Sequence, residues 1–207
     1  MSLQTYDDLK SEIAKWLRRP GDQQLAASIP TMIQFAESRI NNELRIARMV
    51  RFKTINVEGD RFDRPSDFLE MISFGLTDQK DMEFTVCSPR DIQSRSGFYY
   101  AHAGDQIVVR DTDDATLTRN FDMEYYAKVP CLCDAEQSWL LSDQPDLYLF
   151  GALVFSAPFI GNDARAATWE TGYQNALNGL QSRDDKARWS GESLTLKAPA
   201  RDGVAWR

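Results

Sequence analysis

The chain has 207 residues, of which 43% are hydrophobic and 27% are charged, and its formal net charge is −7. This composition is ordinary for a globular protein with one substantial core, which buries about 70% of the unfolded surface at this length. The acidic balance argues against non-specific binding of nucleic acid, which needs a basic face. The longest apolar run, Leu147–Ile160, has about 14 residues and is too short to cross a bilayer.

The first residues and the cysteines bear on the compartment in which the chain folds. Met1–Lys10 already carries two aspartates, so no secretory signal peptide is expected. Three cysteines cannot all pair within one chain, and Cys131 and Cys133 lie too close in sequence for ordinary pairing. We therefore expect free thiols in a reducing compartment.

Two amphipathic helices are predicted before residue 50. Thr5 is the expected N-cap of the first, with Asp8 at the capping-box position, and Pro20-Gly21 ends this helix. Its apolar residues repeat at helical spacing: Tyr6, Leu9, Ile13, Trp16 and Leu17. Ser28 precedes Ile29-Pro30, and because proline suits a first helical turn, the second helix is expected to begin there. One face of it carries Ile33, Ala36, Ile40, Leu44 and Ala47, and the other carries Glu37, Arg39, Asn41, Asn42 and Arg45.

From residue 50 the hydrophobic pattern changes from helical spacing to alternation, which is typical of strands. Alternation over residues 52–57 ends at the turn Glu58-Gly59-Asp60. Further strands are predicted at Phe68–Leu76, Met82–Cys87, Tyr99–His102, Gln106–Arg110 and Thr116–Lys128. Ala103-Gly104-Asp105 is a hairpin signal. Residues 50–130 are therefore predicted to form a β-rich block of about five or six short strands.

Helical spacing resumes near Ser138. Pro145 is expected to start an apolar helix, and Asn162 or Asp163 to cap the next one. That last helix has an apolar stripe made of Trp169, Tyr173, Ala176, Leu177 and Leu180. Residues 192–207 are too few and too polar to bury their own apolar side chains, so this segment is either disordered or ordered by a partner.

These elements together predict an α+β fold with an inserted block. A helical bundle is expected from residues 1–49 and 131–191, with the β-rich insertion at residues 50–130 between them. An extended C-terminal arm, residues 192–207, is expected to follow the bundle.

Motifs that carry enzymatic or metal chemistry are missing from the sequence. It lacks the G-x-S-x-G, H-E-x-x-H, Walker A and G-x-G-x-x-G patterns. Its one histidine, His102, sits beside a hairpin turn and is predicted to be an exposed or half-buried turn residue. Cys131 and Cys133 form a C-x-C without a second pair, so small buried thiols are favoured over a zinc site that recruits Cys87 and His102.

Two further clusters are weighed against ordinary structural roles. The acidic run over residues 111–114 lacks the glycine and glutamate of a calcium loop, which favours a solvated hairpin tip. Aromatic side chains at Phe98, Tyr99, Tyr100, Tyr125 and Tyr126 could stack on single-stranded nucleic acid, but strand aromatics usually pack in cores. No catalytic, cofactor-binding or metal-binding residue is predicted.

Three segments carry a family resemblance: IPTMIQFAESRINNEL (Ile29–Leu44), QPDLYLFGALVFSAPFIGNDARAATW (Gln144–Trp169) and ARWSG (Ala187–Gly191). With the order of helices, insertion and arm, they resemble the head-to-tail adaptor (connector) proteins of tailed bacteriophages, including the podovirus tail tubular A-type and portal adaptor proteins. The resemblance covers most of the chain through element order and helix texture, whereas the β-rich block carries little recognisable signature.

The resemblance implies a structural role without enzymatic activity. It implies self-association into a ring that matches a dodecameric portal protein and continues the DNA channel to a tail, nozzle or tail-tube protein. DNA would pass through the lumen without specific binding, and no membrane is involved. It also implies a place in the neck or tail of the virion, and in the host cytoplasm during assembly.

Candidate partner-binding residues come from two regions. Buried aromatic and apolar groups dominate interface energy, which nominates Trp189, Leu194, Leu196 and Trp206 in and before the arm. A ring subunit also needs two lateral faces, and the polar flank of the second helix nominates Arg39, Asn42 and Arg45 for one of them.

Three alternatives remain open on the sequence. The first is a different neck component, such as a tail-completion or stopper protein. The second is a tail-associated lytic glycosidase, which needs a cleft holding two carboxylates at hydrolytic spacing. The third is a nucleic-acid binder, which would retain DNA in a salt-dependent way.

Overall fold

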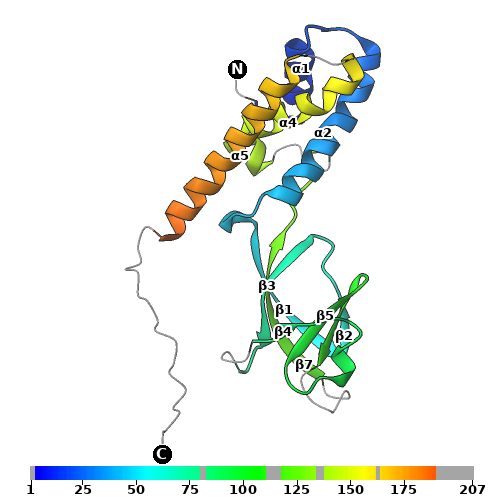
Figure 1. The fold of residues 1–207 in the computed structure, drawn as a ribbon, viewed down its shortest axis with the longest axis vertical. Coiled ribbons are helices and arrows are strands. Elements are labelled where there is room, and N and C mark those ends of the chain that lie inside the picture. Colours follow the sequence, from blue (N-terminus) through cyan, green and yellow to red (C-terminus); the bar gives the residue numbers. More distant parts are fainter. Residues whose placement is uncertain (1–2, 80–82, 111–117, 134–137, 162–163, 190–207) are drawn as a thin grey trace, which may run out of the picture.

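The structure is a computed structural model that describes residues 3–79, 83–110, 118–133, 138–161 and 164–189. Helices lie at one end of an elongated molecule and strands at the other (Figure 1). The described helices are α1 (Tyr6–Trp16), α2 (Gln23–Glu43), α3 (Trp139–Asp143), α4 (Pro145–Ile160) and α5 (Ala166–Trp189). The described strands are β1 (Val50–Glu58), β2 (Arg61–Asp63), β3 (Phe68–Leu76), β4 (Thr85–Val86), β5 (Tyr99–Ala103), β6 (Gln106–Arg110) and β7 (Thr118–Ala127).

The element order confirms the predicted α+β class. Helices α1 and α2 precede the strands, and α3, α4 and α5 follow them. The predicted arm over residues 192–207 and the predicted cap residues Asn162 and Asp163 lie outside the described residues. None of the helices in the described ranges is long and apolar enough to span a membrane.

Helix α1 begins where the sequence predicts. The Thr5 hydroxyl accepts a hydrogen bond from the Asp8 backbone N–H at 3.1 Å, and the Asp8 carboxylate accepts one from the Thr5 N–H at 3.2 Å. This reciprocal capping box satisfies two backbone donors at the helix start. Leu9 and Ile13 are buried as expected, but Trp16 of the same predicted stripe is 41% exposed.

Helix α2 begins at Gln23, so the predicted start at Ser28 is wrong. Asp22 is the N-cap, and its Oδ1 accepts hydrogen bonds from the backbone N–H groups of Gln24 at 3.0 Å and Leu25 at 3.1 Å. Pro30 therefore lies inside the helix, where it removes one backbone donor. The cap and the burial of Leu25 and Ile29 offset that loss, so the helix extends upstream of the proline.

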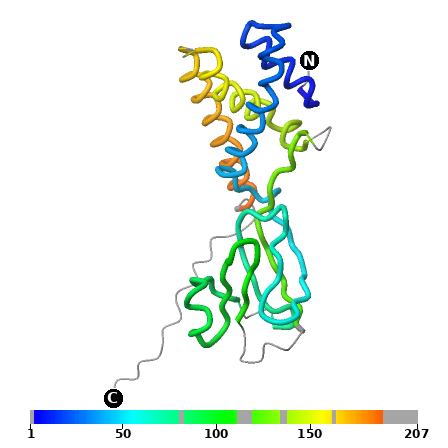
Figure 2. The backbone as a smooth tube through the Cα atoms, turned by 90° about the vertical axis from the view of Figure 1, so that its right-hand side faces the viewer, coloured from blue at the N-terminus to red at the C-terminus, as the bar shows by residue number. Residues whose placement is uncertain are grey.

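Helix α4 lies between α2 and α5, and α1 packs beside α2 and α4 (Figures 1 and 2). Small residues allow this close approach. A Cβ atom on Gly151 of α4 would lie 3.1 Å from the Ala36 Cβ of α2 and 3.4 Å from the Tyr173 ring of α5. Trp169 and Tyr173 are buried in the same core, which confirms the predicted stripe at this end of α5.

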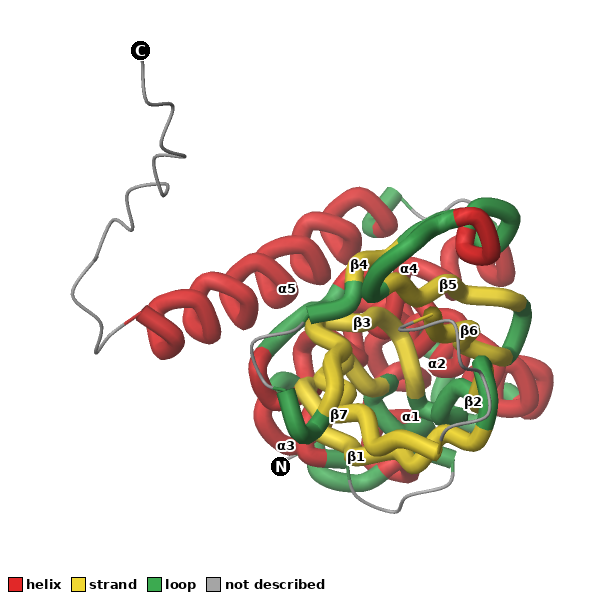
Figure 3. Tube along the Cα trace, turned by 90° about the horizontal axis from the view of Figure 1, so that it is seen from below, coloured by secondary structure: helices red, strands yellow, loops and turns green. Residues whose placement is uncertain are grey.

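The strands form two sheets that share one core (Figure 3). The first has the order β1-β7-β3 and the second the order β2-β6-β5-β4. Phe74 of β3 lies at the centre of the shared core, with ring centroids 5.1 Å from Phe121, 5.4 Å from Phe84 and 5.6 Å from Tyr100. Aromatic packing of this kind stabilises the contact beyond the apolar area that it buries.

The predicted strands are largely confirmed, with two differences. The hairpin at Gly104 joins β5 to β6, which pair antiparallel over Tyr99↔Arg110 to Ala103↔Gln106. The predicted strand Met82–Cys87 is reduced to the two residues of β4, which pairs parallel with β5, and Met82 lies outside the described residues. Strand β2 was not predicted; it has three residues and carries the buried Phe62 into the shared core.

The cysteines depart from the prediction of free thiols. Cys131 and Cys133 form a disulfide, which corrects that expectation for this pair, while Cys87 is free. The turn between the two residues brings their Cα atoms to 5.3 Å, within the span that a disulfide bridges.

Candidate interaction surfaces

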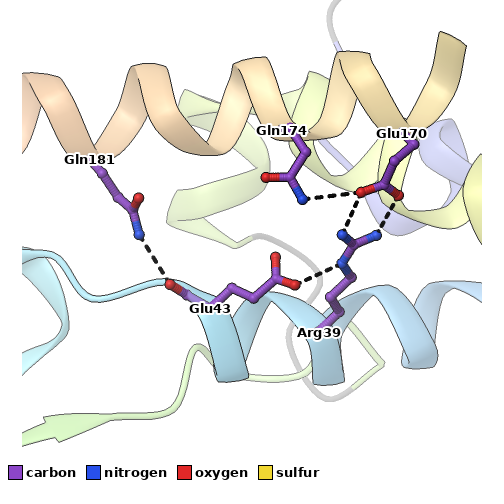
Figure 4. A network of polar contacts seen from close by, with 5 residues as sticks. All are labelled: Arg39, Glu43, Glu170, Gln174 and Gln181. Atoms are coloured by element: carbon purple, nitrogen blue, oxygen red, sulfur yellow. Dashed lines mark hydrogen bonds and ion pairs between the residues drawn. The ribbon is translucent and has the colours of Figure 1, made fainter. Parts of the chain in front are cut away.

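A polar seam joins α2 to α5, and Arg39 lies at its centre (Figure 4). Its guanidinium donates two parallel hydrogen bonds to Glu170, from Nη1 to Oε2 at 2.8 Å and from Nη2 to Oε1 at 2.6 Å. Its Nε donates to Glu43 at 3.0 Å. The same group stacks over the Tyr173 ring, 4.1 Å from the centroid. This bidentate geometry is the strongest form of arginine–carboxylate pairing.

The electrostatics of the seam follow from this geometry. The hydrogen bonds from Arg39 lower the pKa of Glu170 from 4.5 to about 2, against the opposing effect of burial. The same pairing raises the pKa of Arg39 above its usual value. Gln174 donates to Glu170 at 3.0 Å, and Gln181 donates to the backbone carbonyl of Glu43 at 3.0 Å. The seam is therefore an ionised network that holds two helices together.

The Arg45 side chain is hydrogen-bonded at the C-terminal end of α2. Its Nη1 donates to the backbone carbonyls of Asn41 at 2.8 Å and Leu44 at 2.7 Å. Its Nε donates to Glu70 of β3 at 2.9 Å. A cation that satisfies the last helical carbonyls stabilises the helix end, and here it also ties the helices to the first sheet.

The three residues predicted to bind a partner on the flank of α2 therefore differ in their surroundings. Arg39 and Arg45 have partners within their own chain, whereas Asn42 is exposed. Trp189 is the last residue of α5, and its side chain lies outside what the structure describes. Leu194, Leu196 and Trp206 lie outside the described residues as well.

A second set of contacts fixes the helices on the strands. The Glu37 carboxylate, nearly buried in α2, accepts a hydrogen bond from the Leu132 N–H at 2.7 Å. Asn41 accepts from the Val129 N–H at 2.8 Å. The Asp184 carboxylate of α5 accepts from the Ala47 N–H at 3.0 Å. These bonds hold both chain segments that run between the helices and the sheets.

Exposed aromatic side chains are features that the sequence analysis did not nominate. Phe35 of α2 is 52% exposed and Phe159 of α4 is 42% exposed, and Phe52 of β1, at 78%, is the most exposed aromatic side chain among the described residues. A signal was present for Phe35, because it falls outside the apolar spacing of Ile33, Ala36 and Ile40. Apolar side chains grouped on a surface are typical of interaction sites.

An open hollow lies at the junction of α1, α4 and α5. Its volume is about 990 Å³, and its lining includes Trp16, Phe150 and Gly172 with the cations Lys15, Arg18 and Arg165. Trp16 meets Phe150 edge-on, with centroids 5.8 Å apart. The lining has no histidine, cysteine or carboxylate, so its chemistry suits binding of an apolar group near a negative charge.

His102 occupies a structural position. It is half-buried in β5, and its ring lies 5.6 Å from Tyr100 and 5.7 Å from Phe68. Burial lowers the pKa of His102, and the nearby Arg64 lowers it further. Within the described ranges, no three His, Cys, Asp or Glu side chains converge to hold a metal ion. The acidic run over residues 111–114 lies outside those ranges.

Comparison with known families decides how this architecture is classified. A model of the SU10 adaptor protein family matches residues 4–198, nearly the whole chain. The chain belongs to the SU10 adaptor protein family. No curated protein matches it. The resemblance to phage adaptor proteins is therefore confirmed, and the adaptor family indicates a structural component of the virion that interacts with portal and tail components.

Proposed function

We propose that this SU10-family adaptor is a subunit of the connector ring between head and tail. In this proposal the ring binds the portal protein on one side and a tail, nozzle or tail-tube protein on the other, and DNA passes through its lumen. The observation that carries the proposal is the family match over residues 4–198, which includes both groups of helices and all the strands. The detailed likeness to podovirus tail tubular A proteins is part of the proposal.

The physical character of the chain supports this role. The formal charge of −7 suits a lumen through which DNA slides without tight phosphate contacts. The polar seam and the hydrogen bonds at Glu37 and Asn41 hold helices and sheets as one shaped block. A building block that works through assembly needs this rigidity. We propose no catalytic activity, and expect no release of peptidoglycan fragments in a lysis assay.

The proposal is tested by mixing the purified chain with portal rings of the same phage. We expect a complex whose mass, measured by native mass spectrometry, corresponds to a closed ring of adaptors on each portal, matched to a dodecameric portal. The control is the same mixture with portal rings from an unrelated phage. Absence of a complex with the cognate portal would contradict the proposal.

The arm is tested separately by removing residues 192–207. We propose that Trp189, Leu194, Leu196 and Trp206 anchor the adaptor on the portal, because an arm that becomes ordered on a partner gains large contact area from few residues. The truncated chain should fold with an unchanged circular dichroism spectrum but fail to join heads to tails. Normal tail attachment by the truncated chain would show that the arm assignment is wrong.

A further inference from the structure

Two aromatic features of the helical end have opposite shapes. The knob consists of Phe35 on α2 with Phe155 and Phe159 on α4. The socket is the hollow at the junction of α1, α4 and α5, lined by Trp16, Phe150 and Gly172 with Lys15, Arg18 and Arg165 at its rim. Both features pack partly against the helical core and leave aromatic surface exposed, at Phe35 and Phe159 in the knob and at Trp16 in the socket.

The knob projects from an uncharged surface. The Phe35 and Phe155 rings are in contact, with centroids 5.6 Å apart, and Phe159 follows one helical turn after Phe155. All exposed residues of α2 from Gln23 to Ser38 are uncharged, since the single charged residue of that stretch, Glu37, is buried. Depletion of charge around exposed aromatic groups is the composition of an interface centre.

The socket is built rather than incidental. Arg165 donates to the Trp16 carbonyl at 3.1 Å and stacks over the Trp169 ring at 5.0 Å, which fixes α5 against the end of α1. At Gly172 a Cβ atom would lie 3.0 Å from the Phe150 ring, so a larger residue there would require that ring to shift away from α5. The result is an open aromatic floor in a hollow of about 990 Å³.

Knob and socket lie on opposite sides of α4. Phe150 and Phe159 are nine residues apart in that helix, and at about 100° per residue they project at about 180° to each other. Helix α4 lies between α5 and α2 (Figure 1), and the socket includes residues of α5 whereas the knob includes Phe35 of α2. The knob of one chain therefore cannot enter its own socket, but it can enter the socket of a second copy.

Charge complementarity points to the same occupant. Phe159 lies in the last turn of α4, where helix carbonyls concentrate partial negative charge and no basic residue is present. Pro158 has no N–H to donate to the carbonyl of Val154, which adds to this excess of acceptors. The lining of the socket includes three cations, Lys15, Arg18 and Arg165, of which Lys15 also pairs with Glu12 at 3.0 Å and Arg165 donates to the Trp16 carbonyl. An apolar group next to a negative helix end is the ligand that this socket fits.

We propose that the knob of one subunit sits in the socket of the next, as the lateral contact of the adaptor ring. Such a contact is heterologous, so it repeats from copy to copy and closes by rotation. A ring subunit needs two different lateral faces, and the two features lie on opposite sides of α4. The inference rests on the proposed function as a ring subunit.

Site-directed cross-linking on portal-assembled rings tests the pairing. In a Cys87→Ser background, Gln34→Cys marks the knob and Thr171→Cys marks the socket; both residues are exposed. With a short bismaleimide, a chain that carries both cysteines should give a ladder of multimers. A mixture of the two single-cysteine chains should give dimers only, and each single-cysteine chain alone should give none. Dimers formed by Gln34→Cys chains alone would show a symmetric contact and overturn the pairing.

Charge substitutions provide the second measurement. The knob variant combines Phe35→Glu with Phe159→Glu, and the socket variant combines Trp16→Glu with Arg18→Glu. Each should reduce the yield of rings on the portal at least tenfold, with an unchanged circular dichroism spectrum. The matched control is Phe52→Glu, which replaces the most exposed aromatic side chain at a site away from both features and should leave ring yield unchanged.

The outcomes separate this inference from the function on which it rests. If wild-type chains assemble on the portal and both variants do so equally well, the assignment of faces is wrong while the connector proposal stands. If wild-type chains do not assemble on the cognate portal, the connector proposal itself fails.

Discussion

Arg39 shows how a residue on the polar flank of a helix can be used entirely within its own chain. Its spacing on α2 suggests an exposed cation, yet it makes a bidentate pair with Glu170, which lies 131 positions away in sequence. No local pattern reveals such a partner. A position on the polar flank of a helix therefore does not show whether a side chain is free to bind a partner; its contacts within the chain have to be known.

The Arg39–Glu170 pair gives a pH-dependent prediction. The folded pKa of Glu170 is about 2, below the ordinary value of 4.5, so the ionised carboxylate stabilises the folded state. This contribution is fully present above about pH 5 and is lost as the pH falls from 4.5 toward 2. Because the Glu170 side chain is 40% exposed, we expect roughly 1 kcal/mol rather than the full value of the shift.

Glu170→Gln tests this by urea denaturation at several pH values. The variant should be less stable than wild type by roughly 1 kcal/mol at pH 7, and the difference should shrink steadily below pH 4.5. Glu12→Gln, which breaks an exposed pair with Lys15 on α1, is the control and should change stability by less than about 0.5 kcal/mol. A difference for Glu170→Gln that stays constant down to pH 2 would contradict the assignment.

At the scale of elements, α2 shows which local signal sets a helix start. Two signals compete: Ser28 before Ile29-Pro30, and Asp22 after Pro20-Gly21. Asp22 prevails because it satisfies two backbone donors and adds the buried Leu25 and Ile29 to the core. Each buried apolar side chain contributes roughly 1.5–3 kcal/mol, comparable to the roughly 3 kcal/mol that an internal proline costs.

Substitution of the two competing residues should therefore have different effects. Asp22→Ala should lower the free energy of unfolding by about 1 kcal/mol, because two first-turn N–H groups lose their acceptor. Ser28→Ala removes only a hydroxyl that bonds back to the Gln24 carbonyl at 2.9 Å, so stability should stay equal or rise by up to about 0.5 kcal/mol. Thermal or chemical unfolding of both variants measures these changes. A larger loss of stability for Ser28→Ala than for Asp22→Ala would indicate that the helix begins at Ser28.

At the scale of the whole molecule, two hydrophobic cores are joined by a junction that contains hydrogen bonds as well as apolar contacts from Leu69 and Tyr126. One core lies among the helices and the other between the sheets. Glu37 and Asn41 of α2 bind the segment that returns from β7 to the helices. Hydrogen bonds to a carboxylate in a nearly buried site are costly to leave unmade, so this junction determines how firmly the two ends hold their relative position.

Glu37→Leu tests the junction against Glu37→Gln. Leucine removes the acceptor of the Leu132 N–H and should lower the free energy of unfolding by about 1–3 kcal/mol. Glutamine keeps an acceptor oxygen in the same place and should cost less than half as much. Equal losses in the two variants would show that the charge, and not the hydrogen bond, is what matters at this position.

Local periodicity was sufficient to predict the α+β class, the cap of α1, the β5–β6 hairpin and the buried stripe of α5. Each of these depends on residues within a few positions of one another, as at Thr5 and Asp8, where spacing alone determines the contact. Strand β2 was not predicted and β4 was predicted too long, because two or three residues carry no period and form strands only through pairing with β6 and β5.

The amino-acid sequence by itself determined which segments are helical, which alternate as strands, and which family the chain resembles. Only the tertiary structure decided that Arg39 and Arg45 are paired within their own chain and that Trp16 is exposed. The physical reason is the separation along the sequence between the residues that interact. Caps, turns and periods arise from neighbours in sequence, whereas exposure and ion pairing depend on segments far apart in the chain, 25 residues for Arg45 and Glu70 and 131 for Arg39 and Glu170.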